Sequence, residues 1–144
     1  MTYPKPYDDA RFPERLVVIE SPYAGDVATN LRYLRDCIAD CLKRGEYPYA
    51  SHGLFPQFMP DDDQDVRRLC MEAGFAWARS AATCTAVYGD LGTSAGMKEG
   101  ILRAQEDGRV VEYRSLPQWS QIGGRPMRWE RHGHGMRLVV GKAS

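Results

Sequence analysis

Short apolar runs alternate along this chain with longer segments in which apolar residues recur every three or four positions. Residues 16–19 form a continuous, mostly β-branched run, which is typical of a strand buried on both faces. A helical pattern follows from Val27, and Gly45 ends it. The alternation repeats through residue 113, with strands expected over 46–51, 83–88 and 109–113. It predicts an α/β fold, a Rossmann-like parallel sheet flanked by helices with right-handed crossovers.

The two ends of the chain depart from this alternation. Residues 1–14 contain three prolines and several charges, and we expect an N-terminal arm there. Residues 115–144 predict a C-terminal extension of the same globule, with a β-hairpin formed by residues 126–131 and 135–140 around a glycine turn. Two histidines in that turn lack an evident third ligand, so we expect neither a metal site nor a cofactor.

Composition limits the classes of partner. The chain has 144 residues, enough for one domain with a core, and its 19 Lys and Arg balance its 19 Asp and Glu. Zero net charge argues against binding to a nucleic-acid polymer or a membrane surface. The chain has no apolar run near the ~20 residues of a membrane span, no secretory pattern at its start, and four cysteines without a CxxC pair. We therefore expect a cytoplasmic protein with reduced, buried cysteines.

The segment from Tyr88 to Gly100 is the strongest candidate site. A strand ends at Tyr88, a small polar loop containing Gly92 and Thr93 follows, and Ser94 precedes a helix. Helix N-termini bind anions because their first N–H groups have no partner in the helix. Glu99 lies in the second turn, and Gly100 costs about 1 kcal/mol relative to Ala in mid-helix, which suggests that side chains are kept out. The alternative is ordinary helix capping beside a solvated glutamate.

Two further polar loops follow expected strands. Residues 21–25 come after the first strand, and His52 comes after the second. The carboxyl ends of parallel strands lie on one edge of a sheet, where ligands of such folds bind. We therefore expect all three segments to form one site.

These motifs resemble the nucleoside 2-deoxyribosyltransferase superfamily, which includes 2'-deoxynucleoside 5'-phosphate N-hydrolases and short phage-borne relatives. The resemblance covers roughly residues 15–114. Its most specific part is the glycine-serine-to-glutamate segment from Ser94 to Glu99. The other residues that carry the resemblance are Ser21, Pro22, Tyr23, Ala24, Gly25, Asn30, His52, Arg67 or Arg68, Gly96 and Met97.

The resemblance implies an enzyme that cleaves or exchanges the N-glycosidic bond of a nucleoside 5'-monophosphate or nucleoside. Glu99 would be the nucleophile, and the loop with Gly92, Thr93 and Ser94 would hold the 5'-phosphate or 5'-hydroxyl. Residues 21–25 would contact sugar and base. The aspartate that usually serves as acid in the family is absent, so Glu72, Asp90 or His52 would replace it.

Two functions of different class remain at this point. One is an N-glycosidase or deoxyribosyltransferase; the other is a non-catalytic module that binds a small phosphorylated ligand. The resemblance also implies a homo-oligomer, which we expect to be a dimer. Aromatic residues outside the domain could supply the contacts, since interfaces favour them: Tyr3, Tyr7, Trp119 and Trp129.

Overall fold

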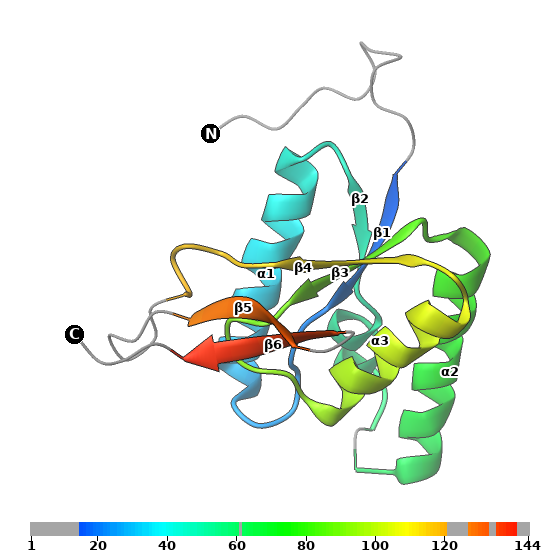
Figure 1. The fold of residues 1–144 in the computed structure, drawn as a ribbon. Coiled ribbons are helices and arrows are strands. Elements are labelled where there is room, and N and C mark those ends of the chain that lie inside the picture. The colour runs from blue at the N-terminus through cyan, green and yellow to red at the C-terminus, as the bar shows by residue number, and fades with distance from the viewer. Residues whose placement is uncertain (1–14, 61, 121–126, 133–134, 141–144) are drawn as a thin grey trace.

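The computed structural model describes residues 15–60, 62–120, 127–132 and 135–140 (Figure 1). Four parallel strands form its main sheet in the order β2-β1-β3-β4. This arrangement confirms the predicted α/β fold with a parallel sheet. The strands are β1 (Leu16–Glu20), β2 (Tyr47–Tyr49), β3 (Cys84–Tyr88) and β4 (Val110–Arg114).

Three helices connect these strands, each with an acidic or hydroxyl cap at its start. They are α1 (Val27–Lys43), α2 (Gln64–Ala81) and α3 (Ala95–Glu106). Asp26, Asp63 and Ser94 each accept a hydrogen bond from a backbone N–H of the first turn, which satisfies donors that the helix leaves free. Two short 3₁₀ turns, η2 (Ser51–Gly53) and η3 (Phe55–Gln57), join β2 to α2.

The main core lies between the sheet and α1. Helix α1 supplies Tyr33, Leu34, Cys37 and Cys41 to this core, and the sheet supplies every second residue of β1 and β3. Cys37, Cys41 and Cys84 are buried and free, while Cys70 is only partly buried. The opposite face of the sheet carries α2 and α3, as right-handed crossovers require for this strand order.

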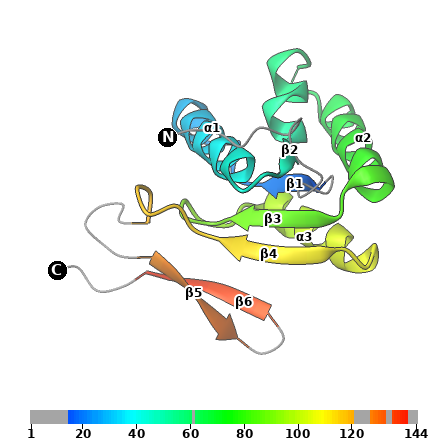
Figure 2. The same cartoon turned by 90° about the horizontal axis from the view of Figure 1, so that it is seen from above.

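The order of the strands creates a switch point between β1 and β3. From β1 the chain moves to β2 on one side, and from β3 it moves to β4 on the other. Figure 2 shows β3 and β4 side by side and pointing the same way. In open parallel sheets, the loops that diverge at such a point leave a crevice for a ligand.

Outside the main sheet, β5 (Met127–His132) and β6 (Gly135–Val140) pair in antiparallel fashion. The expected N-terminal arm, with Tyr3 and Tyr7, lies outside the described residues, and so do residues 133 and 134 of the expected glycine turn. Trp119 packs on its own domain: its ring lies edge-on to Tyr33 at 5.2 Å, and its Nε1 donates to Asp36 at 2.8 Å. The homodimer stays a prediction. Among the residues described, none of the helices has the length and apolar character of a membrane span.

Candidate functional site

A cavity of about 240 Å³ opens at the carboxyl edge of the sheet, at the switch point. This volume lies just below the roughly 300–1,000 Å³ of pockets for drug-sized molecules, so the cavity suits a small ligand. Four segments form it: the loop after β1, the η2–η3 segment, α2 and the start of α3. Its walls are mainly apolar and include Phe55, Pro56, Met59, Met71 and Phe75.

A serine–histidine pair forms one polar side of the cavity. Ser21 Oγ and His52 Nε2 are 2.7 Å apart. Burial lowers the pKa of His52 to about 4, so the ring is neutral at pH 7. Gly74 of α2 lets η2, which carries His52, lie close against this helix, because a Cβ at residue 74 would come within 2.6 Å of Ser51 Oγ. A glycine on the helix therefore lets η2 lie close enough to join the site.

The start of α3 and Arg67 form the second polar side. Ser94 Oγ accepts the N–H of Met97 at 3.2 Å. Ala95 and Gly96 line the cavity, and their N–H groups are among the first of the helix, which have no acceptor within it. Arg67 also lines the cavity, and its guanidinium makes no hydrogen bond or ion pair within the described part of the chain. This side is suited to an anion.

Glu20, the last residue of β1, lines the same cavity, and we did not select it from the sequence. Its carboxyl group has no hydrogen-bond or ion-pair partner among the residues that the structure describes. Removal from water raises its pKa to about 8, and the charge of Arg109 opposes that shift only in part. Two sequence features could have identified it: a charged residue follows the apolar run of residues 16–19, and Gly100 is a glycine in mid-helix.

Six of the eleven predicted binding residues line the cavity: Ser21, Tyr23, His52, Ser94, Gly96 and Met97. The other five, Pro22, Gly25, Asn30, Gly92 and Thr93, are not part of its lining. Asn30 instead shapes the first loop, because its amide donates to the carbonyls of Tyr23 at 2.8 Å and Ala24 at 3.1 Å. Gly25 and Gly92 have φ values of 99° and 97°, which the loops need for their turns.

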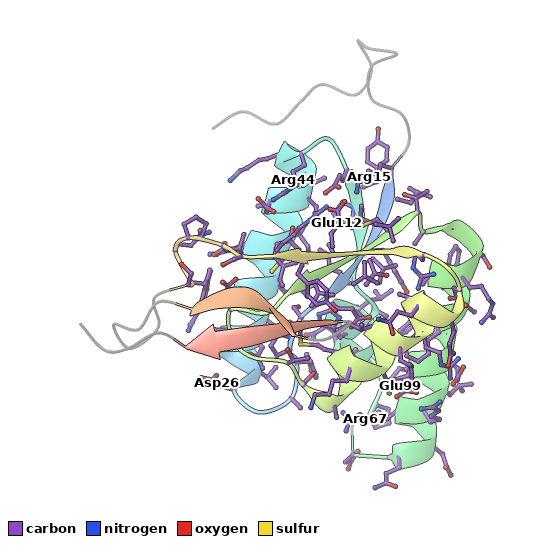
Figure 3. The ribbon with its side chains drawn as sticks, viewed as in Figure 1. Arg15, Asp26, Arg44, Arg67, Glu99 and Glu112 are labelled. Carbon is purple, nitrogen blue, oxygen red and sulfur yellow. The ribbon has the colours of Figure 1, made fainter. Side chains whose placement is uncertain are left out.

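The predicted nucleophile, Glu99, does not line the cavity. Its carboxylate accepts from Arg68 at 2.8 Å and lies 3.9 Å from Arg103. Glu72 joins the same cluster, 2.7 Å from Arg68 and 2.8 Å from Arg103. Figure 3 shows Glu99 and Arg67 on the side of the molecule that carries α2 and α3. Gly100, one residue further along α3, is the position that faces Glu20. Glu99 therefore points about 100° away from that direction.

Asp90, the third predicted catalytic carboxylate, is buried on the α1 side of the sheet. It accepts hydrogen bonds from Tyr33 Oη at 2.6 Å, Ser115 Oγ at 2.5 Å and the N–H of Leu116 at 2.9 Å. These contacts tie α1 and the segment after β4 to the end of β3. The structure thus places all three predicted catalytic carboxylates outside the lining of the cavity, each held by other partners.

The fold is that of a small α/β domain with a cavity at the switch point of its sheet. A family model described as a domain of unknown function (DUF7768) matches residues 15–114, which is more than half of the chain. The chain belongs to this family. No curated protein and no solved structure matches it.

Proposed function

We propose that this protein cleaves the N-glycosidic bond of a nucleoside 5'-monophosphate or nucleoside, by hydrolysis or by base exchange. One observation carries the proposal: a single cavity combines an anion-binding side, apolar and aromatic walls, and a carboxyl group without a partner. A nucleotide presents three matching parts, namely a phosphate, a flat base and a sugar carbon bonded to nitrogen.

The anion-binding side is suited to the 5'-phosphate. Arg67 contributes a cation that no described residue neutralises, and the start of α3 contributes N–H groups and the favourable end of the helix dipole. Phosphate bound in this way needs no metal ion. Within the described residues, no cluster of three or more potential metal ligands occurs.

The apolar walls are suited to the base. Phe55 and Phe75 offer aromatic surface, and the nearby methionines and prolines exclude water.

The base leaves more easily when it receives a proton, and the sugar passes through an oxocarbenium-like state that a carboxylate stabilises. A glutamate inside the cavity supports catalysis, whereas a purely binding site for an anion gains nothing from an unpaired carboxyl.

Base release tests the proposal. The wild-type protein is incubated with each common nucleoside and its 5'-monophosphate, and the free base is resolved by chromatography. We expect release from at least one monophosphate. Arg67→Gln should raise KM for that monophosphate about tenfold or more and leave KM for the nucleoside nearly unchanged, because only the phosphate meets the guanidinium. Arg79→Gln, an exposed arginine at the far end of α2, is the matched control.

A second outcome would support the binding module instead. The position of Glu99, Glu72 and Asp90 outside the cavity lining favours this alternative. In that case no base appears from any compound, yet a monophosphate raises the melting temperature of the protein. Absence of both base release and a thermal shift contradicts nucleotide recognition altogether.

A further inference from the structure

The carboxyl group of Glu20 lies against the backbone of α3 at Gly100. A Cβ built on residue 100 would overlap Cδ and Oε1 of Glu20 and would lie 2.8 Å from Oε2. Gly100 is buried in the middle of a twelve-residue helix, where glycine is less favourable than alanine. The helix therefore gives up stability at the one position where a side chain would displace this carboxyl group from its seat.

The surroundings of Glu20 leave its carboxyl group available to a ligand. It lines the cavity and makes no hydrogen bond or ion pair with the residues that the structure describes. The charge that acts on it most is that of Arg109, which is already engaged with Thr85 Oγ1 at 2.9 Å and Asp107 at 3.1 Å. The other titratable groups of the cavity are the neutral ring of His52, Tyr23, Cys70 and the guanidinium of Arg67.

We propose that Glu20 is the catalytic acid of the N-glycosidic cleavage and donates its proton to the departing base. This inference rests on the proposed function and assigns its reacting residue. The proton moves from the Glu20 carboxyl to a ring nitrogen of the base, and the C1'–N bond breaks with its electron pair going to the base. Water then bonds to C1' and gives a proton to the Glu20 carboxylate, which restores the acid.

The acid role fits Glu20 better than a nucleophilic role. A nucleophile must be ionised, whereas this carboxyl group lies in a poorly hydrated site without a hydrogen-bonded cation, which favours the neutral form. Glu99 and Glu72 are in the opposite condition, since each accepts a hydrogen bond from Arg68. They lie outside the lining of the cavity, so neither is placed to deliver a proton to a ligand there.

The first experiment compares base release by the wild type and by Glu20→Gln. Removal of a general acid typically costs 10²–10⁴-fold, so we expect kcat to fall at least about 100-fold. The thermal shift produced by the nucleotide should remain, because glutamine keeps the size of the side chain. Glu106→Gln is the matched control: this glutamate is exposed at the end of α3, so the variant should keep the wild-type rate.

A second measurement separates an acid from a nucleophile or a structural residue. A 4-nitrophenyl deoxyriboside has a leaving group that needs no proton, so Glu20→Gln should cleave it within about threefold of the wild-type rate. In the wild type, kcat/KM for the nucleotide should fall as pH rises through about 8, where the free carboxyl group ionises. If Glu20 were instead a nucleophile, Glu20→Gln would remain inactive on the nitrophenyl substrate. The wild-type kcat/KM would then rise with pH through about 8, because a nucleophile must be ionised.

The outcomes distinguish the two proposals. If the wild type releases base and Glu20→Gln does so at a similar rate, the assignment of Glu20 is wrong and the proposed function stands. Loss of activity in Glu99→Gln with retention in Glu20→Gln also overturns it, in favour of the sequence-based nucleophile. If the wild type releases no base from any nucleoside or monophosphate, both proposals fail.

Discussion

Two acidic residues lie at the carboxyl ends of neighbouring strands, and their surroundings differ completely. Asp90 follows β3 on the side of α1, where three donors point at its carboxylate. Glu20 ends β1 on the side of α3, where the described residues offer it no hydrogen bond or ion pair. A carboxylate that is fully hydrogen-bonded stabilises the fold, whereas one removed from water without a partner lowers its stability.

The polar groups on one side of the sheet edge are therefore satisfied within the fold, whereas the other side leaves a carboxyl group without a partner beside a cavity. On the Asp90 side, Tyr33 both donates to the carboxylate and accepts the Asp90 N–H at 3.0 Å, so the polar groups satisfy one another. On the Glu20 side, the neutral His52 and the start of α3 surround an open cavity. Four experiments test this contrast.

Asp90→Ala should have the largest effect on stability. It leaves the donors of Tyr33, Ser115 and Leu116 without their acceptor in a buried site, and each unsatisfied group costs about 1–3 kcal/mol. We expect the free energy of unfolding to fall by about 3–5 kcal/mol, measured by urea denaturation. Glu106→Ala is the exposed control. A loss below about 1 kcal/mol would show that Asp90 does not hold these segments together.

Glu20→Gln should change how stability depends on pH. The folded state raises the pKa of Glu20 from 4.5 to about 8, so between these values it holds the proton that the unfolded chain releases. Wild-type stability therefore declines as pH rises through this window, by an amount that reaches a few kcal/mol. Glutamine cannot ionise, so Glu20→Gln should become relatively more stable above pH 8. Parallel pH curves for the two proteins would place Glu20 in contact with water.

A pair of glycine substitutions in α3 sharpens the comparison. Gly100→Ala adds a methyl group where the Glu20 carboxyl lies, so we expect a loss of about 1–3 kcal/mol in stability. Gly96→Ala meets nothing closer than Ser94 Oγ at 4.0 Å and should stabilise by up to about 1 kcal/mol. Thermal unfolding of both variants measures the difference. The contrast fails if both substitutions stabilise the protein equally.

Glu99→Gln should have the smallest effect on stability. Glu99 pairs with the exposed Arg68, and such surface pairs contribute little because water and salt screen them. We expect the melting temperature to change by no more than about 2 °C, and by less in 1 M NaCl. A much larger change would show that the cluster of Arg68, Glu72, Glu99 and Arg103 fixes α2 against α3.

The order of the elements and the edge of the sheet at which the cavity opens followed from the sequence alone. Strand and helix periods differ, so the alternation through residue 113 was visible without a structure. The caps Asp26 and Ser94 were equally local, because a cap depends on residues within one turn. Parallel strands end on one edge, and this brought Ser21, His52 and Ser94 to a single cavity.

Only the tertiary structure decided which carboxyl group faces that cavity. Glu99, Glu72 and Asp90 each have a partner 25–57 residues away in the chain, and no local pattern encodes such contacts. The role of Gly100 was visible as an oddity in a helix, but the group that it admits comes from β1, 80 residues earlier. Sequence determines the direction of each side chain relative to its own helix or strand, whereas its partners depend on how those elements pack.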